Sequence, residues 1–374
     1  MKRNPKILVF TGNRSEYGLL KHVIKLIKSN LYLDLKLFVS ASHISKKFGN
    51  TISEIKKDKI EIDKLISTSL DKSPVPSTTT LTAEIINEMG KALEEFKPNI
   101  CILLGDRYET VGAALACHLN KIPIAHLHGG ETTLGAIDDK LRHAISQLST
   151  WHFTAADQYR KRVIEMGHDH KKVFMVGPLA IDGIANMKNI NRIEFSSKTG
   201  YKFSSKNVIV TYHPETLLKN NGIEGFSELL IALENFDGNI LFTHPNADEG
   251  RDKILEMINQ FSNLNPEKTF VFPSLGQDLY LSALSLFEGV IGNSSSGIIE
   301  APIIGIPVLN IGDRQKGRLR YGRVLDVRPN SIQITKGIKE ILSWKEANIW
   351  PRKLETTNKL PSDFIVSWLL KQNL

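Results

Sequence analysis

The chain has 374 residues, of which 41% are hydrophobic and 24% charged, as is ordinary for soluble globular proteins. A chain of this length is long for one hydrophobic core, so two domains are expected. The net charge is +8, but the basic residues are dispersed and form no stripe with interleaved aromatic residues, which argues against a nucleic-acid partner. Two cysteines in apolar surroundings are too few for a disulfide framework.

The first half of the chain alternates short apolar runs with longer amphipathic stretches. The opening run, KILVFTG, is too short for a signal peptide or a membrane span, so a cytoplasmic protein without a membrane partner is expected. Strands are expected over residues 6–12, 33–40, 99–106, 122–130 and 173–177, and helices over 17–28, 83–95 and 108–119. This alternation is typical of parallel sheets covered on both faces, so residues 1–182 are expected to form a Rossmann-like lobe.

The same pattern restarts after residues 188–206, a polar stretch that is expected to be a connector. Strands are expected over residues 207–213, 239–244, 268–274, 289–295 and 306–312. Residues 183–355 are therefore expected to form a second Rossmann-like lobe of the same α/β class. A last helix begins at Ser362 and carries an apolar stripe with Trp368, so residues 356–374 are expected to pack back on the first lobe.

Polar, glycine-rich segments follow these strands: TGNRSEYG, GDRYE, HGGE, YHPET, THPNADEG, GNSSSG and GDRQKGR. In doubly wound sheets the ligand lies beyond the carboxyl ends of the strands, where such loops converge. Ser294, Ser295 and Gly297 follow a strand and open a helix, where backbone N–H groups can reach a diphosphate. Glu300 can accept hydrogen bonds from ribose hydroxyls. The alternative is an ordinary Ser/Gly turn with a glutamate in the first turn of the helix.

Three arginines, Arg14, Arg107 and Arg314, occupy equivalent loops after strands. A guanidinium binds phosphate oxygens with a fork of donors, so one anionic ligand would account for all three, and solvated loop arginines are the alternative. TGNRSEYG does not match the G-x-G-x-x-G pattern, which argues against a dinucleotide, and no cofactor is expected.

The acid–base candidates are Asp106, His128, Glu131, Asp138 and His213. Carboxylates that share a partly dry site have separated pKa values, so one can act as a base and another as an acid. The alternative for Asp138 is a helix start with a surface salt bridge to Arg142. HLHGGE leads from a strand into a glycine turn and is not HExxH on a helix, so no metal site is expected.

Together these motifs resemble the hydrolysing UDP-N-acetylglucosamine 2-epimerases of bacterial sialic acid biosynthesis. The likeness runs from about Lys6 to Arg323 and is carried by TGNRSEYG, GDRYE, HGGETTLGAIDDKLRHAISQLS, YHPET, IGNSSSGIIEAP and NIGDRQKGR. It implies two lobes of the GT-B glycosyltransferase type with the active site in the cleft between them, and a homodimer or homotetramer. It also implies that UDP-N-acetylglucosamine and water give N-acetylmannosamine and UDP through 2-acetamidoglucal.

The resemblance implies catalytic roles for Asp106, Asp138 and His213. Contacts to UDP are expected for Arg14, Arg107, His244, Asn246, Ser274, Ser294, Ser295, Gly297, Glu300 and Arg314. Many relatives read H-x-E-G-G-E with a catalytic first glutamate, whereas this chain has His128 at that position. Either His128 or Glu131 therefore takes the role of that glutamate.

Three alternatives to this function remain open. The sister enzymes that act on UDP-N,N'-diacetylbacillosamine in the legionaminic acid pathway look alike, so the groups on carbons 4 and 6 of the sugar stay undecided. A GT-B glycosyltransferase would use the same nucleotide together with an acceptor. A catalytically inactive nucleotide-sugar sensor would bind the substrate without turnover. The IDDKLRH motif, in place of PxPEExNR, favours an enzyme that releases the free sugar.

Overall fold

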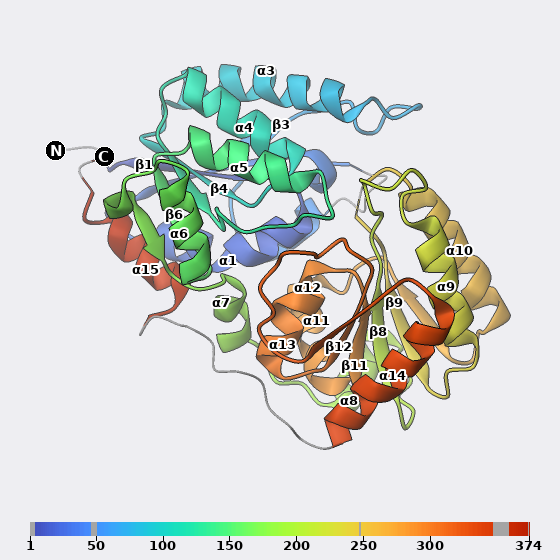
Figure 1. Ribbon diagram of the computed structural model, residues 1–374. Helices are drawn as coiled ribbons and strands as arrows, with labels where there is room; N and C mark the ends of the chain where they lie inside the picture. The colour runs from blue at the N-terminus through green and yellow to red at the C-terminus, as the bar shows by residue number, and fades with distance from the viewer. Residues whose placement is uncertain (1–3, 46–50, 247, 347–358, 373) are drawn as a thin grey trace. The chain divides into compact units, whose positions relative to one another are not determined.

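The computed structural model describes residues 4–45, 51–246, 248–346, 359–372 and 374. Contacts within the chain divide it into two compact units. Unit 1 consists of Met1–Glu131, Asp138–Asp182 and Glu355–Leu374, and unit 2 of Thr132–Ile137 and Gly183–Leu354. Each unit is a parallel sheet with helices on both faces (Figure 1), which confirms the predicted fold class of two Rossmann-like lobes.

The sheet of unit 1 has seven strands, and all its pairings are parallel. In sheet order the strands are β3 (Lys64–Ile66), β2 (Asp34–Ser40), β1 (Lys6–Thr11), β4 (Ile100–Leu104), β5 (Ile124–Leu127), β6 (Trp151–Thr154) and β7 (Val173–Met175). The chain runs outward from β1 to β3, returns to β4 on the other side of β1, and continues to β7. The direction of winding therefore switches between β1 and β4, where the loops at the carboxyl ends can part around a ligand.

Helices cover both faces of this sheet. They are α1 (Arg14–Ser29), α2 (Ile52–Lys57), α3 (Thr78–Phe96), α4 (Tyr108–Leu119), α5 (Asp138–Leu148), α6 (Asp157–Glu165), α7 (Ala180–Ala185, at the boundary with unit 2) and α15 (Pro361–Leu369), with 3₁₀ turns η1 (Ala41–His43) and η2 (His170–Lys172). Successive strand side chains point to opposite faces. Accordingly Ile7 and Val9 pack in a core with α1 and α15, while Leu8 and Phe10 pack in a core with α3 and α4.

The last helix, α15, packs within unit 1 beside α1. The Trp368 ring makes edge contacts with Trp151 and Phe153, with ring centroids 5.1 Å apart in both pairs. The buried carboxylate of Asp182 accepts hydrogen bonds from the backbone N–H of Ser362 at 3.1 Å and from its hydroxyl at 2.7 Å. These contacts join the first turn of α15 to the end of the segment Asp138–Asp182 of unit 1.

Unit 2 repeats the strand order with six parallel strands. In sheet order they are β10 (Thr269–Phe272), β9 (Asn239–Thr243), β8 (Asn207–Thr211), β11 (Gly289–Gly292), β12 (Val308–Ile311) and β13 (Val324–Val327). The switch in winding lies between β8 and β11, the counterparts of β1 and β4. The two units share this architecture without a visible internal sequence repeat.

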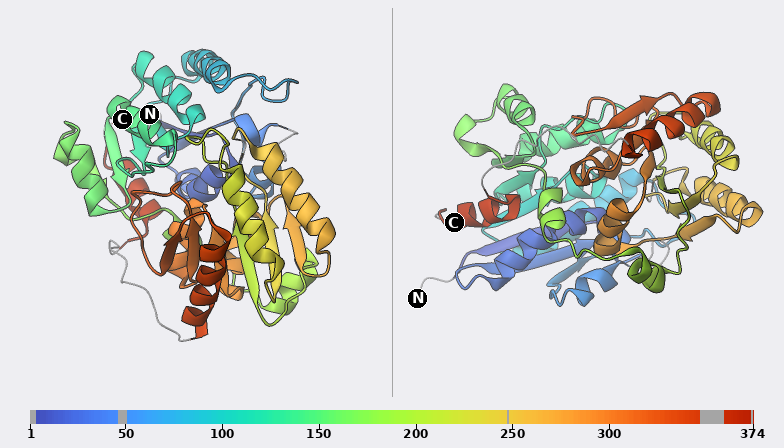
Figure 2. Two further views of the ribbon diagram at one scale, coloured as in Figure 1. Left: turned by 45° about the vertical axis from the view of Figure 1, so that its right-hand side comes forward. Right: turned by 90° about the horizontal axis from the view of Figure 1, so that it is seen from below.

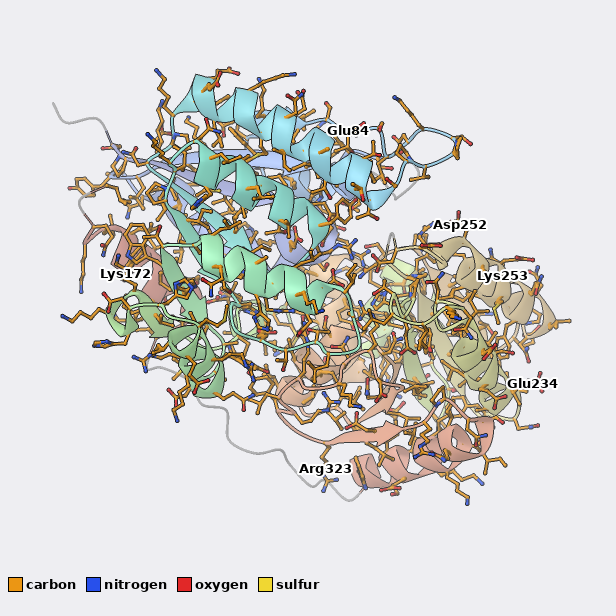
Figure 3. All side chains as sticks on the ribbon, turned by 45° about the horizontal axis from the view of Figure 1, so that its top comes forward. Glu84, Lys172, Glu234, Asp252, Lys253 and Arg323 are labelled. Atoms are coloured by element: carbon orange, nitrogen blue, oxygen red, sulfur yellow. The ribbon has the colours of Figure 1, made fainter. Side chains whose placement is uncertain are left out.

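The helices of unit 2 are α8 (Arg192–Thr199), α9 (Ile223–Glu234), α10 (Arg251–Leu264), α11 (Gly276–Leu286), α12 (Ser295–Ile298), α13 (Glu300–Ile304) and α14 (Ser331–Glu346). One face of the sheet packs against α9, α10 and α14, and Figure 2 shows the yellow to gold helices α9 and α10 side by side. The other face packs against α8 and α11. Directly before β13, the Arg323 guanidinium lies 5.3 Å from the Trp344 ring centroid on α14. Figure 3 labels Arg323.

Several sequence-based boundaries need correction. Residues 188–206 are not a plain connector, because α8 forms there and buries Phe195. The strand predicted over 289–295 ends at Gly292, since Ser295 already belongs to α12. Three strands were not predicted, namely β3, β6 and β13. Among the residues described here, no helix is both long and apolar enough to cross a membrane.

A short segment, Thr132–Ile137, leaves unit 1 after Glu131 and returns to it at Asp138. Within unit 2 the Leu134 N–H donates to the Lys316 carbonyl at 2.9 Å. At Gly135 a Cβ atom would lie 1.9 Å from the Asp313 carbonyl oxygen, so only glycine fits against this backbone. The segment is thus fitted to the loop after β12.

Candidate functional site

In unit 1 the loop after β4 is held by a buried histidine. Burial lowers the pKa of His126 to about 4, so its ring is neutral at physiological pH. Nε2 lies 2.8 Å from the Gly105 carbonyl oxygen and Nδ1 lies 3.0 Å from the Ser146 hydroxyl. A carbonyl only accepts, so Nε2–H donates to Gly105 and the Ser146 hydroxyl donates to Nδ1. This arrangement fixes the turn that presents Asp106.

The centre of the unit 1 site is Arg142 on α5, whose side chain is only 1% exposed. One guanidinium nitrogen pairs with Asp106 Oδ2, and the other lies 3.4 Å from Glu131 Oε2. Burial alone would lower the pKa of Arg142, but the charges of Asp106, Glu131 and Asp138 raise it above its usual value. The structure thus gathers the three predicted carboxylates of unit 1 around one permanent positive charge.

This cluster decides between the two interpretations of the Asp138–Arg142 spacing. A surface salt bridge requires an exposed arginine, and Arg142 is buried. Arg142 is therefore a central residue of the site that was not among the predicted residues. Its only signal was the i,i+4 spacing, which is the same for a surface pair and a buried one.

His128 lies in the same cluster, on the turn after β5. The Leu179 backbone N–H donates to Nε2 at 3.1 Å, and Nδ1 lies 2.9 Å from Glu131 Oε1. The contact between Nδ1 and Glu131 Oε1 is a close polar contact rather than an aligned hydrogen bond. Both ring nitrogens of His128 are therefore engaged with groups of unit 1.

A second buried carboxyl pair, Glu16 and Glu109, lies where β1 and β4 end. The Gly12 N–H donates to Glu16 Oε2 at 2.8 Å, and Arg107 Nε donates to Glu109 Oε2 at 3.3 Å. Burial, followed by the charge of Glu109, raises the pKa of Glu16 to about 8. The sequence analysis did not single out either glutamate, since each sits in the first turn of a helix, where acidic residues are common.

The two predicted arginines of unit 1 stand beside this pair. Arg107 is engaged with Glu109 and its guanidinium lies 5.6 Å from the Tyr108 ring centroid. Arg14 is half-buried at the start of α1. Its charge adds to burial in lowering the pKa of His43 to about 3. Both arginines therefore lie at the switch point of the sheet, near the carboxyl ends of β1 and β4.

In unit 2 the switch point carries His213. The Asn246 backbone N–H donates to Nδ1 at 3.0 Å, so the ring proton lies on Nε2, 3.3 Å from the Ser294 hydroxyl oxygen. Ser294 caps α12 and accepts from the Ser296 N–H at 3.4 Å. Three predicted residues, from the loops after β8, β9 and β11, are thereby joined in one hydrogen-bonded group.

Asn293, which the sequence analysis did not single out, joins the loops of this group. Its amide pairs with the backbone of His213 in both directions, at 2.7 and 2.9 Å, and its side chain is fully buried. The Asn293 carbonyl accepts from Arg314 Nη1 at 3.1 Å and from Gln315 at 2.9 Å. Asn293 thus holds Arg314 against the end of β11, although its sequence context is that of an ordinary Ser/Gly turn.

The remaining predicted residues of unit 2 lie in the same set of loops. Ser295 is the first residue of α12 and Glu300 the first residue of α13. Gly297 is buried, and a Cβ there would contact Val308 at 3.2 Å, so this glycine lets α12 approach the sheet. His244 follows β9, and the Ser274 hydroxyl accepts from the Gly276 N–H at 2.9 Å. Within the described ranges of the chain, no group of three or more His, Cys, Asp or Glu side chains is arranged to hold a metal ion.

Comparison with known proteins adds an independent finding. The family model described as UDP-N-acetylglucosamine 2-epimerase matches residues 25–356. Over 328 residues (87% of this chain, 85% of the relative) the chain is 37% identical to GDP/UDP-N,N'-diacetylbacillosamine 2-epimerase (hydrolyzing) of Campylobacter jejuni. Over 335 residues (89% and 85%) it is 33% identical to polysialic acid biosynthesis protein P7 of Escherichia coli. The Neisseria meningitidis UDP-GlcNAc 2-epimerase bound to UDP-GlcNAc superposes with a TM-score of 0.80 at 20% identity, covering 98% of this chain and 100% of that chain.

Proposed function

The chain belongs to the UDP-N-acetylglucosamine 2-epimerase family, and from this premise we propose that it is a hydrolysing 2-epimerase of a UDP-linked 2-acetamido sugar. The observation that carries the proposal is the cluster of Asp106, Glu131 and Asp138 around the buried Arg142. Epimerisation at a carbon that bears hydrogen needs a base and an acid, and a carboxylate cluster supplies both.

The proposed reaction has two steps. A carboxylate of unit 1 removes the proton on sugar carbon 2 while the bond between carbon 1 and the UDP oxygen breaks, which gives 2-acetamidoglucal and UDP. Water then adds its hydroxyl to carbon 1 as an acid delivers a proton to the opposite face of carbon 2. The proton on carbon 2 is weakly acidic, so departure of UDP must lead and positive charge must develop at carbon 1.

We assign the leaving nucleotide to the group around His213. Its Nε2–H and the Ser294 hydroxyl are hydrogen-bonding groups suited to phosphate oxygens, and Arg314 lies on a neighbouring loop. In this proposal Ser295, Glu300, His244, Asn246 and Ser274 complete the UDP contacts of unit 2, and Arg14 and Arg107 are the candidate anion-binding residues of unit 1. No metal or cofactor enters either step.

Two substrates are compatible with the family. UDP-N-acetylglucosamine is the first candidate, in keeping with the family model and with a role in sialic acid synthesis. UDP-N,N'-diacetylbacillosamine is the second, favoured by the 37% identity to the Campylobacter jejuni enzyme. They differ on carbons 4 and 6, away from the bonds that break, so the same carboxylates serve both.

The test is to incubate the protein with each sugar nucleotide in deuterated water and follow the proton NMR spectrum. We expect UDP and a free sugar of inverted configuration with deuterium on carbon 2. Free sugar without inversion would contradict epimerisation, and an unchanged spectrum with both substrates would contradict the enzyme class. The Asp106→Asn variant should bind UDP as the unmodified protein does while losing about 10²–10⁴-fold in turnover.

A further inference from the structure

We propose that His128 is a positioning residue for Glu131, and that Glu131 is the catalytic group that takes the place of the glutamate common in the family at position 128. The inference rests on the proposed function. It decides between two assignments that the sequence leaves open, and it depends on the hydrogen-bond partners of one imidazole ring.

Both ring nitrogens of His128 face groups of unit 1, Nε2 through a hydrogen bond and Nδ1 through a close polar contact. A backbone N–H can only donate, so the Leu179 N–H fixes Nε2 as an acceptor, and the single ring proton must lie on Nδ1. Nδ1 lies 2.9 Å from Glu131 Oε1. A general acid or base must come within hydrogen-bonding distance of the substrate proton. At His128 Nδ1 the neighbouring group is the Glu131 carboxylate.

The backbone of the turn supports the same assignment. His128 adopts φ of +61°, in the left-handed region, which few residues other than glycine adopt and in which asparagine, aspartate and histidine are enriched among them. The next residue, Gly129, leaves room for His126, because a Cβ there would lie 3.0 Å from His126 Nδ1. With this backbone conformation the His128 ring lies against Glu131 and the Leu179 N–H.

Arg142 supports both partners at once. Its Nη1 donates to the His128 carbonyl at 3.3 Å and to Glu131 Oε2 at 3.4 Å. Glu131 therefore has one carboxylate oxygen near a ring N–H and the other near a guanidinium. The charged groups around the ring are Glu131, Arg142 and, through Arg142, Asp106. A carboxylate that is bonded to a guanidinium on one oxygen and contacts a fixed ring with the other keeps one orientation, which proton transfer to a fixed sugar carbon requires.

The test compares His128→Asn, His128→Gly and Glu131→Gln. Asparagine and glycine both tolerate the left-handed conformation, but only asparagine places an N–H near the position of Nδ1. We expect His128→Asn to keep kcat within about 10-fold of the unmodified protein and to keep its pH profile. Glu131→Gln removes a general acid or base and should lose about 10²–10⁴-fold in kcat.

The kcat of His128→Gly should lie between the kcat values of His128→Asn and Glu131→Gln. The loss should be in kcat rather than in KM, since an orienting group acts on the bound substrate. Melting temperatures of all three variants verify that they fold. Loss of one limb of the pH profile in His128→Asn, or full activity in Glu131→Gln, would overturn the inference. A protein that turns over neither sugar nucleotide would instead overturn the proposed function, so the two failures are distinguishable.

Discussion

The two units use one topology for different chemistry. In both sheets the winding switches between the first and fourth strands, and the predicted site residues gather there. Unit 1 places carboxylates around a guanidinium beyond the carboxyl ends of β4 and β5, whereas unit 2 places a histidine, hydroxyls and amides at its switch point. The strand order therefore decides where a ligand binds, and the loop residues decide what is done to it.

The difference also has an energetic side. Burying an ionised group is costly unless it is paired, so unit 1 depends on a complete set of charge partners. In unit 2 the hydrogen bonds between Asn293 and His213 are neutral and contribute less individually, and Arg314 is the charged donor of that group. Substitutions at the two switch points are therefore expected to differ in size.

The largest effect is expected for Arg142→Met, which keeps much of the side-chain volume and removes the charge. Asp106 and Glu131 would then be left without their guanidinium partner, and breaking such a buried pair costs about 3–5 kcal/mol. Urea unfolding should show this loss in unit 1 and no hydrolysis should remain. Arg314→Met in unit 2 is the matched control, with a smaller loss of stability; equal losses would remove the contrast between the units.

A smaller effect is expected for Asn293→Ala in unit 2. The variant leaves the N–H and carbonyl of His213 without their partner, at about 1–3 kcal/mol for each buried group left unsatisfied. Differential scanning calorimetry should show a lower melting temperature for unit 2, and isothermal titration should show weaker UDP binding. An unchanged UDP affinity would mean that the loop does not depend on this amide.

The third effect depends on pH. The pKa of Glu16 is raised to about 8 from its ordinary value of 4.5, so the folded state retains a proton that the unfolded chain releases between these values. Its contribution is fully present below pH 4.5 and is lost as the pH rises toward 8. Glu16→Gln should therefore stabilise unit 1 increasingly over this window, by at most about 1.4 kcal/mol per pH unit. Parallel stability curves for variant and unmodified protein would contradict this ionisation.

The smallest effect is expected for Arg323→Ala, away from both switch points. Its stacking on Trp344 is of the kind that contributes about 0.5–1 kcal/mol at an exposed site. The melting temperature of unit 2 should fall slightly, while hydrolysis and UDP affinity stay unchanged. A change in activity would show that the chemistry extends beyond the loops at the carboxyl ends of the strands.

The sequence predicts the strands that are apolar over their whole length, and with them the loops that carry the site. It fails where burial is partial or comes from distant residues. The strand β13 has only half-buried and exposed side chains, so its pattern resembles a loop. The helix α8 lies in a polar stretch and is fixed by one buried residue, Phe195. Local patterns carry no information on such tertiary contacts.

The site residues divide in the same way. His213, Asp106 and Ser294 follow strands directly, so their place could be inferred from the alternation of strands and helices. Arg142 and Asn293 could not be singled out, because burial and bridging between loops arise only when distant segments meet. The choice between His128 and Glu131 needs the Leu179 N–H, which lies about 50 residues further along the chain.

The segment Thr132–Ile137 has a consequence for recombination between relatives. A chimera made by joining two homologous proteins at residue 182 would take this segment from one parent and the loop that receives it from the other. Because Gly135 leaves no space against the Asp313 backbone, the two pieces must be matched in shape. The boundary of a functional module therefore does not follow the order of residues in the gene, and exchanges that move residues 132–137 together with the loop after β12 should yield active hybrids more often.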